Sequence, residues 1–349
     1  MRGNLRMSKI QEDLVELKTK LKAYVDRGRQ IGFSDIRQQP LIVTKPDITK
    51  IKPLKKVKNC NSRFLAVDCS TRTLKRAHNW GIYLMRVAYA SVEGRTVNWG
   101  YGESVVSPVG DRRYRSNFLI DQRLQLESEM ALKLLHEEPT GGVEPHGETL
   151  RGLDEGDYVL LDGASFFGGK RGFHTSLYEE ALRKKVNLLA ISKQSPMLCD
   201  EKGRDFMAST TILAAYPLWV YHPVKEANMA EHLYGDVSLV KLCEDSQHVF
   251  RCDIMDPLAS SNVSEFLSPL TSLSEDPRCL GYPVTLWLAH EFSGASNSKI
   301  LQYYDLIEEE LSVAGILETL RREELSCSFA DKIHGITRPY EGGESFDRI

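Results

Sequence analysis

The chain has 349 residues, of which 42% are hydrophobic and 27% are charged, and its formal net charge is −3 at pH 7. These values are typical of a soluble globular protein of one large or two ordinary domains, and no apolar run approaches the roughly 18 residues that a transmembrane helix needs. The seven cysteines form no Cys-x-x-Cys pair, which indicates reduced thiols. With no apolar signal-peptide region at the start, we expect a cytoplasmic protein without membrane contact.

The first 63 residues differ in charge from the rest of the chain. They carry 16 Lys and Arg against 6 Asp and Glu, and the densest part is residues 50–58. Apolar residues at three- and four-residue steps from Ile10 to Tyr24 predict an amphipathic helix. We expect residues 1–63 to form a helical and basic extension that would attract a polyanion. The alternative is a solvated linker.

Residues 64–349 read as a single α/β domain. A strand at 64–70, with a turn after Asp68, and strands near 80–92 and 96–106 predict an antiparallel meander. The elements expected next are a helix at 117–137, a loop at 139–147, a strand ending at Asp162, a helix at 175–185, a strand at 187–191, strands near 217–222, 236–243 and 247–254, and C-terminal helices at 283–293 and 298–322. This order predicts a ribonuclease H-like mixed sheet with flanking helices and extra C-terminal helices.

Two apolar strands of this pattern end on a carboxylate. Asp68 is followed by Cys-Ser, and Asp162 is followed by Gly-Ala-Ser. Two buried strands that bring an Asp to the same rim of a sheet would place two oxygen ligands within reach of one hard cation. Paired carboxylates of this kind hold metal ions in phosphodiester-cleaving enzymes. The alternative is that each Asp caps the turn after it.

The helix between these strands supplies a third acid. Glu127 shares a helix face with Ala131 and Leu134, whereas Glu129 lies roughly 160° away around the axis. A Glu on the buried face is costly unless it is paired or bound to a cation, so Glu127 is favoured over Glu129 as a metal ligand. The alternative is a surface ion pair between Arg123 and Glu127.

Three further side chains are candidates for the same site. Lys193 leaves a buried strand and would hold a phosphate as a point charge, or else form a salt bridge with one of the acids. Pro283 fixes the first turn of a helix that carries His290, with Tyr282 just ahead of it. A His can bind a metal or move a proton, and a Tyr can hold a phosphate, although a lone His is often structural.

Together these elements resemble the NurA family of prokaryotic, chiefly archaeal, nucleases. The matching residues are Asp68-Cys-Ser, Arg123 to Glu127, Leu-Leu-Asp162-Gly, Ile-Ser-Lys193, and Tyr282-Pro with Ala-His290. The resemblance implies a ribonuclease H-like fold, Mn²⁺- or Mg²⁺-dependent DNA cleavage, a homodimer, and a hexameric HerA-type ATPase as partner in the resection of DNA ends. It also implies the site residues: Asp68, Glu127 and Asp162 as metal ligands, Tyr282 and His290 completing the site with His290 a further candidate ligand, and Lys193 at the phosphate.

Two positions depart from the family pattern, because Cys69 stands where Gly is usual and Ala164 where Ser is common. Neither removes a proposed ligand. The expected reaction is phosphodiester hydrolysis with two ions about 4 Å apart. The resemblance implies that the enzyme is a 5′–3′ exonuclease and single-strand endonuclease. Two alternatives stay open: a phosphotransferase of the actin and sugar-kinase type, and a non-catalytic adaptor that loads a translocase onto DNA.

Overall fold

The computed structural model describes residues 42–136, 143–146, 152–167, 172–195, 198–255 and 262–327. The amphipathic helix expected between Ile10 and Tyr24 lies outside these residues. Within them, no helix combines the length and the apolar character that crossing a membrane requires.

A ten-stranded mixed sheet forms the centre of the molecule. Its strands are β2 (Ile51–Pro53), β3 (Arg63–Arg76), β4 (Gly81–Glu93), β5 (Thr96–Val106), β6 (Val143–His146), β7 (Tyr158–Asp162), β8 (Asn187–Ser192), β10 (Trp219–Lys225), β11 (Asp236–Lys241) and β12 (Phe250–Ile254). They lie side by side in the order β2-β10-β11-β12-β8-β7-β3-β4-β5-β6. A separate two-stranded sheet joins β1 (Ile42–Val43) to β9 (Leu198–Cys199).

The middle of the sheet has the ribonuclease H-like topology that the element order predicts. Strands β3, β4 and β5 form an antiparallel meander. Helix α2 (Arg112–His136) then leads to β7, which runs parallel to β3, and α3 (His174–Lys184) leads to β8, which runs parallel to β7. Each parallel pair needs a crossover connection of this kind. The predicted fold class is therefore confirmed.

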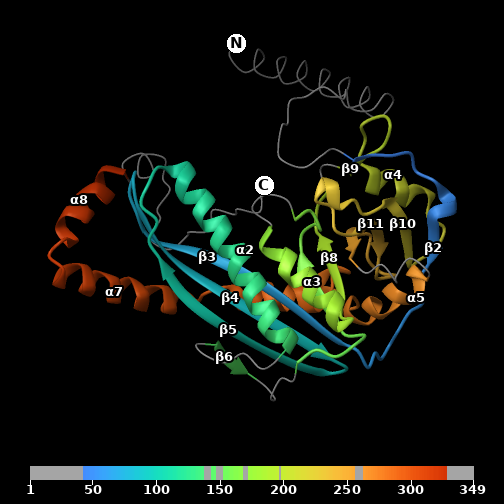
Figure 1. Ribbon diagram of the computed structural model, residues 1–349, viewed down its shortest axis with the longest axis horizontal. Coiled ribbons are helices and arrows are strands. Elements are labelled where there is room, and N and C mark those ends of the chain that lie inside the picture. The colour runs from blue at the N-terminus through green and yellow to red at the C-terminus, as the bar shows by residue number, and fades with distance from the viewer. Residues whose placement is uncertain are drawn as a thin grey trace, which may run out of the picture.

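Helices cover both faces of this sheet, so its central strands are apolar on both sides. Along β3, Leu65 and Val67 point into one core cluster with α2 and α3, and Phe64 and Ala66 point into another with α6 (Val284–Ser293). In Figure 1, α2 and α3 lie across the front of the sheet and the orange C-terminal segment passes behind it. The right-hand part also contains the α-helices α4 (Phe206–Leu213) and α5 (Val263–Leu267).

Some elements differ from the sequence-based expectation. The strand at Asp68 does not turn there: β3 continues to Arg76, paired with β4, because β-branched Thr71 and Thr73 extend it. The single helix expected at 298–322 is two helices, α7 (Asn297–Val313) and α8 (Leu317–Cys327), separated at Gly315, whose φ is +71°.

The structure also has strands where the sequence predicted other conformations. Part of the loop expected at 139–147 is β6, and the basic stretch contains the edge strand β2, paired with β10. The two C-terminal helices pack on the far end of the long β3–β4 ribbon, at the left of Figure 1.

Candidate active site

Asp68 and Asp162 lie next to each other on two central parallel strands. The β3–β7 register pairs Val67 with Leu161, and the next residue on each strand is one of the two acids. Neighbouring strands are about 4.8 Å apart, and successive side chains alternate between faces. Both carboxylates therefore point to the face covered by α6, at the place where β7 ends and β3 continues.

His290 on α6 contacts the first of these acids. Its Nδ1 lies 2.9 Å from Oδ2 of Asp68, and the hydroxyl of Ser293, one turn further on, donates to the same oxygen at 3.2 Å. Burial pushes the pKa of the Asp68 carboxyl upward, but the hydrogen bond from His290 and the nearby charge of Arg123 outweigh it and hold the pKa below its usual value. The hydrogen bond to Asp68 raises the pKa of His290. Each group thus favours the charged form of the other.

Lys193 and Tyr282 contact the second acid. Nζ of Lys193 lies 2.9 Å from Oδ2 of Asp162, and the Tyr282 hydroxyl donates to Oδ1 at 3.2 Å. The Lys193 ammonium also lies over the Tyr282 ring, 5.5 Å from its centre. Burial, together with the charge of Asp162, raises the pKa of Tyr282 well above its usual value, so this phenol stays a neutral donor. The salt bridge that the sequence left as an alternative for Lys193 is present.

Glu127 reaches the same region from the opposite face of the sheet. The pairing of β3 with β7 ends at Val67 and Leu161. Two residues further along β3, the amide of Cys69 donates to Oε1 of Glu127 at 3.2 Å. Nε of Arg123 lies 3.1 Å from the same oxygen. Glu129, in contrast, is exposed and accepts a hydrogen bond from Gln125 on its own helix. Of the two glutamates, Glu127 is the one that contacts β3, at the residue that follows Asp68.

Two contacts that the sequence does not reveal hold α6 against the sheet. The hydroxyl of Ser70 donates to the carbonyl of Ser293, and Nη1 of Arg86 donates to the carbonyl of Gly294 at 3.0 Å. Ser70 and Arg86 are directly paired across β3 and β4. The end of α6, and with it His290, is thereby fixed over Asp68.

These carboxylates suit a hard divalent cation in chemistry, since carboxylate oxygens are the ligands that Mg²⁺ and Mn²⁺ prefer. Their arrangement in the structure is different. In the part of the chain that is described, no group of three or more His, Cys, Asp or Glu side chains is arranged to hold a metal ion. Asp68, Asp162 and Glu127 each contact a basic side chain instead. Binding one cation through several of them requires these basic groups to move.

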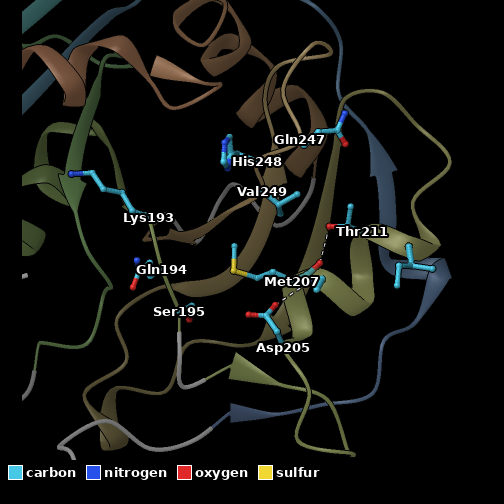
Figure 2. Close-up of a pocket in the computed structure, with 11 residues that line it drawn as sticks. Lys193, Gln194, Ser195, Asp205, Met207, Thr211, Gln247, His248 and Val249 are labelled. Atoms are coloured by element: carbon cyan, nitrogen blue, oxygen red, sulfur yellow. Dashed lines mark hydrogen bonds between the residues drawn. The ribbon is translucent and has the colours of Figure 1, made fainter. Parts of the chain in front are cut away.

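An open cavity of about 650 Å³ adjoins the site, on the other side of Lys193. Figure 2 shows the Lys193 side chain leading away from this cavity, while Met207 and His248 lie around its centre. The other residues that line it come from the loop after β8, from α4 and from the loop before β12: Gln194, Ser195, Asp205, Ala208, Thr211, Ile212, Gln247 and Val249. No helix is predicted from the sequence at the position of α4, so this cavity is not identified from the sequence.

Comparison with known proteins supports the fold. No protein-family model and no curated protein matches the sequence. Among solved structures, the NurA nuclease from Sulfolobus solfataricus is similar with a TM-score of 0.55 and 14% identity, over 88% of this chain and 98% of that one. Another NurA structure has a TM-score of 0.46 at 11% identity, over 90% and 97% of the chains. Endonuclease V from Ciona intestinalis, in complex with DNA, has a TM-score of 0.35 at 12% identity, over 81% and 96%. By the first of these similarities, the chain has a NurA-like fold.

Proposed function

We propose that this protein is a metal-dependent DNA nuclease that hydrolyses phosphodiester bonds at the end of β7. The observation that carries the proposal is the adjacent placement of Asp68 and Asp162 on parallel strands, with both side chains on the face covered by α6. A charged or donor side chain from another element contacts each acid. Structural acids that only cap turns have no need of such partners.

Asp68, Glu127 and Asp162 are the proposed ligands of Mn²⁺ or Mg²⁺, with two ions as the expected number and His290 as a further candidate. Bound divalent ions activate water and stabilise the leaving oxygen in phosphodiester hydrolysis. A published NurA structure was determined with manganese, and another with dAMP and manganese. The manganese was found in those proteins. For the present protein, the proposal is supported by the chemistry of the three carboxylates, whose oxygens are ligands that Mn²⁺ and Mg²⁺ prefer.

The other side chains have separate proposed roles. His290, half exposed beside Asp68, is placed to move a proton. Lys193 bears a charge that a phosphate oxygen can take over from Asp162. The neutral hydroxyl of Tyr282 orients Asp162. Together these groups supply the proton donor and the anion contact that hydrolysis requires.

The finer features of the function rest on the family resemblance together with the NurA-like fold. They are a 5′–3′ exonuclease and single-strand endonuclease activity, a homodimer, and work with a hexameric HerA-type ATPase in DNA-end resection. We place the reaction in the cytoplasm, where reduced thiols are usual, since all seven cysteines are free.

The test is digestion of end-labelled single- and double-stranded DNA by the purified full chain, with Mn²⁺, Mg²⁺ or EDTA. Glu127→Gln and Glu129→Gln make a matched pair, because both change the same residue type on one helix and only Glu127 contacts β3. We expect metal-dependent cleavage that is lost in Glu127→Gln and retained in Glu129→Gln. Equal activity of the two variants would contradict the proposed ligand set.

The same assay decides a second candidate function, the non-catalytic adaptor. One observation favours the adaptor: each acid of the site already contacts a basic side chain. DNA binding without cleavage under any metal, together with co-purification of an ATPase, would support the adaptor and exclude the nuclease.

A further inference from the structure

A buried ion pair on β12 lies outside the proposed catalytic residues. Arg251 and Asp253 lie on the same face of the strand, and they are 4% and 0% exposed. Nε of Arg251 is 2.6 Å from Oδ1 of Asp253, and Nη2 is 2.7 Å from Oδ2, so the contact is bidentate. A buried ion pair is often no more stabilising than apolar side chains of similar volume. Stability alone gives little reason for charges at these two positions.

Asp253 holds the loop that follows β7. The amide and the hydroxyl of Ser165 both donate to its Oδ2, each at 2.9 Å. The same hydroxyl accepts from the amide of Gly235 at 3.1 Å, and the carbonyl of Ser165 accepts from the amide of Tyr234 at 3.0 Å. Ser165 is fully buried and comes shortly after Asp162 in the chain. The loop therefore leaves the candidate site along a path fixed by four hydrogen bonds.

Arg251 holds the loop that follows β8. It is paired in register with Ser192, the last residue of that strand, and its Nη1 donates to the hydroxyl of Ser195 at 3.4 Å. Ser195 is buried and comes shortly after Lys193. Because a guanidinium has five N–H donors in a fixed plane, one side chain can bind Asp253 and Ser195 together.

One loop follows Asp162, the last residue of β7, and the other begins with Lys193. The side chains of these two residues meet at 2.9 Å in the candidate site. Close to the strand ends, the amide of Gly163 donates to the carbonyl of Ile191 at 3.1 Å, and the hydroxyl of Ser192 donates to the carbonyl of Gly163. The ion pair holds the two loops a few residues further along the chain, at Ser165 and at Ser195.

We propose that Arg251 and Asp253 are positioning residues that fix Asp162 relative to Lys193. The proposal rests on the proposed function, in which Asp162 binds a metal ion and Lys193 contacts a phosphate. In that reaction a shift of about 1 Å in a ligand or an anion contact can cost about a hundredfold in rate. The ion pair joins the two loops from the opposite face of the sheet, so it constrains them without occupying the site.

The main test replaces both charges at once, in R251M/D253L, because this leaves no unpaired buried charge. Ser195→Ala is the finer variant, since it keeps the ion pair and removes its contact with the loop carrying Lys193. Ser238→Ala is the matched control: this serine is also buried, and its hydroxyl bonds to His222 instead. The measurements are kcat and KM for DNA cleavage, Kd for the same DNA in EDTA, and Tm.

We expect kcat to fall at least about tenfold in R251M/D253L and less in Ser195→Ala, with Kd within about twofold of the wild type. Ser238→Ala should keep the wild-type kcat. An unchanged kcat in the folded double variant would overturn the proposal, as would a loss of kcat matched by an equal loss of DNA affinity. If the double variant does not fold, kcat of Ser195→Ala decides.

A double-mutant cycle tests whether the ion pair acts through the contact between Lys193 and Asp162. In a Lys193→Met background, R251M/D253L should lower kcat by a smaller factor than in the wild type, because the contact it positions is already gone. Equal factors in the two backgrounds would show that the ion pair acts independently of this contact, which contradicts the proposal.

Amide hydrogen exchange keeps this proposal separate from the proposed function. In R251M/D253L the amides of residues 163–165 and 193–195 should exchange faster, while those of α2 keep the wild-type rate. If the wild type cleaves no DNA, the proposed function fails, and faster exchange in both loops still supports the positioning role. Unchanged exchange in both loops overturns the positioning role whether or not the wild type cleaves DNA.

Discussion

His290 and Asp68 join the C-terminal part of the chain to the centre of the sheet, with Nδ1 of one 2.9 Å from Oδ2 of the other. The Asp68 side chain is 11% exposed, whereas that of His290 is 50% exposed. The imidazole therefore lies between a buried carboxylate and the solvent from which a DNA strand would approach. In the proposed reaction it is placed to pass a proton between the two.

Replacing His290 by Asn removes the proton donor and keeps a polar side chain of smaller size. We expect kcat for DNA cleavage to fall by about 10²–10³, because general acid–base groups contribute about that much. The control is His78→Asn, an exposed histidine at the turn between β3 and β4, which should stay within about twofold of the wild type. Wild-type kcat in His290→Asn at saturating metal would exclude a catalytic role for this residue.

Lys193→Met should weaken DNA binding and make it less sensitive to salt. A lysine that neutralises one phosphate contributes about one unit to the slope of log K against log salt concentration, so this slope should fall by about one. The measurement is Kd for single-stranded DNA in EDTA across a salt series. Lys202→Met, at an exposed turn, is the control and should leave the slope unchanged. The same slope in both variants would show that Lys193 contacts no phosphate.

Much of the fold was predictable from the sequence because the central strands have apolar residues at consecutive positions. Apolar side chains on both faces of β3 and β7 identified them as buried strands, and Asp68 and Asp162 interrupt these patterns at adjacent positions. The helix phase separated Glu127 from Glu129 because Ala131 and Leu134 mark the buried side of α2. These inferences needed only local periodicity.

Other features depended on contacts that local periodicity does not encode. The edge strand β2 was hidden in a basic stretch because only Ile51 of its three residues is buried. The ion pair of Arg251 and Asp253 resembles the polar face of an ordinary strand, and its function depends on the loops that lie against it. His290, the basic partner of Asp68, likewise comes from an element far away in the sequence.

Removing one charge of the buried pair should destabilise the protein strongly. Asp253→Ala leaves the Arg251 guanidinium buried without its carboxylate, which typically costs about 3–5 kcal/mol in the free energy of unfolding. Asp205→Ala is the comparison, because Asp205 only caps α4 from an exposed position and its loss should cost about 1 kcal/mol. Urea unfolding of both variants measures the difference. Equal losses would mean that water or another group replaces the missing carboxylate.

The C-terminal helices should separate from the sheet more easily in acid, because Glu308 of α7 anchors them. Hydrogen bonds from Arg321 of α8 and from Lys75 of β3 lower the pKa of Glu308 to about 2 from an ordinary 4.5. A carboxyl with a lowered pKa in the folded state stabilises the protein above its unfolded pKa, and this contribution disappears as the pH falls from 4.5 toward 2. The Tm difference between wild type and Glu308→Gln should therefore be constant above about pH 5 and shrink toward pH 2. The exposed neighbour Glu309→Gln should show little difference at any pH, and a constant difference for Glu308→Gln down to pH 2 would disprove this account of the anchor.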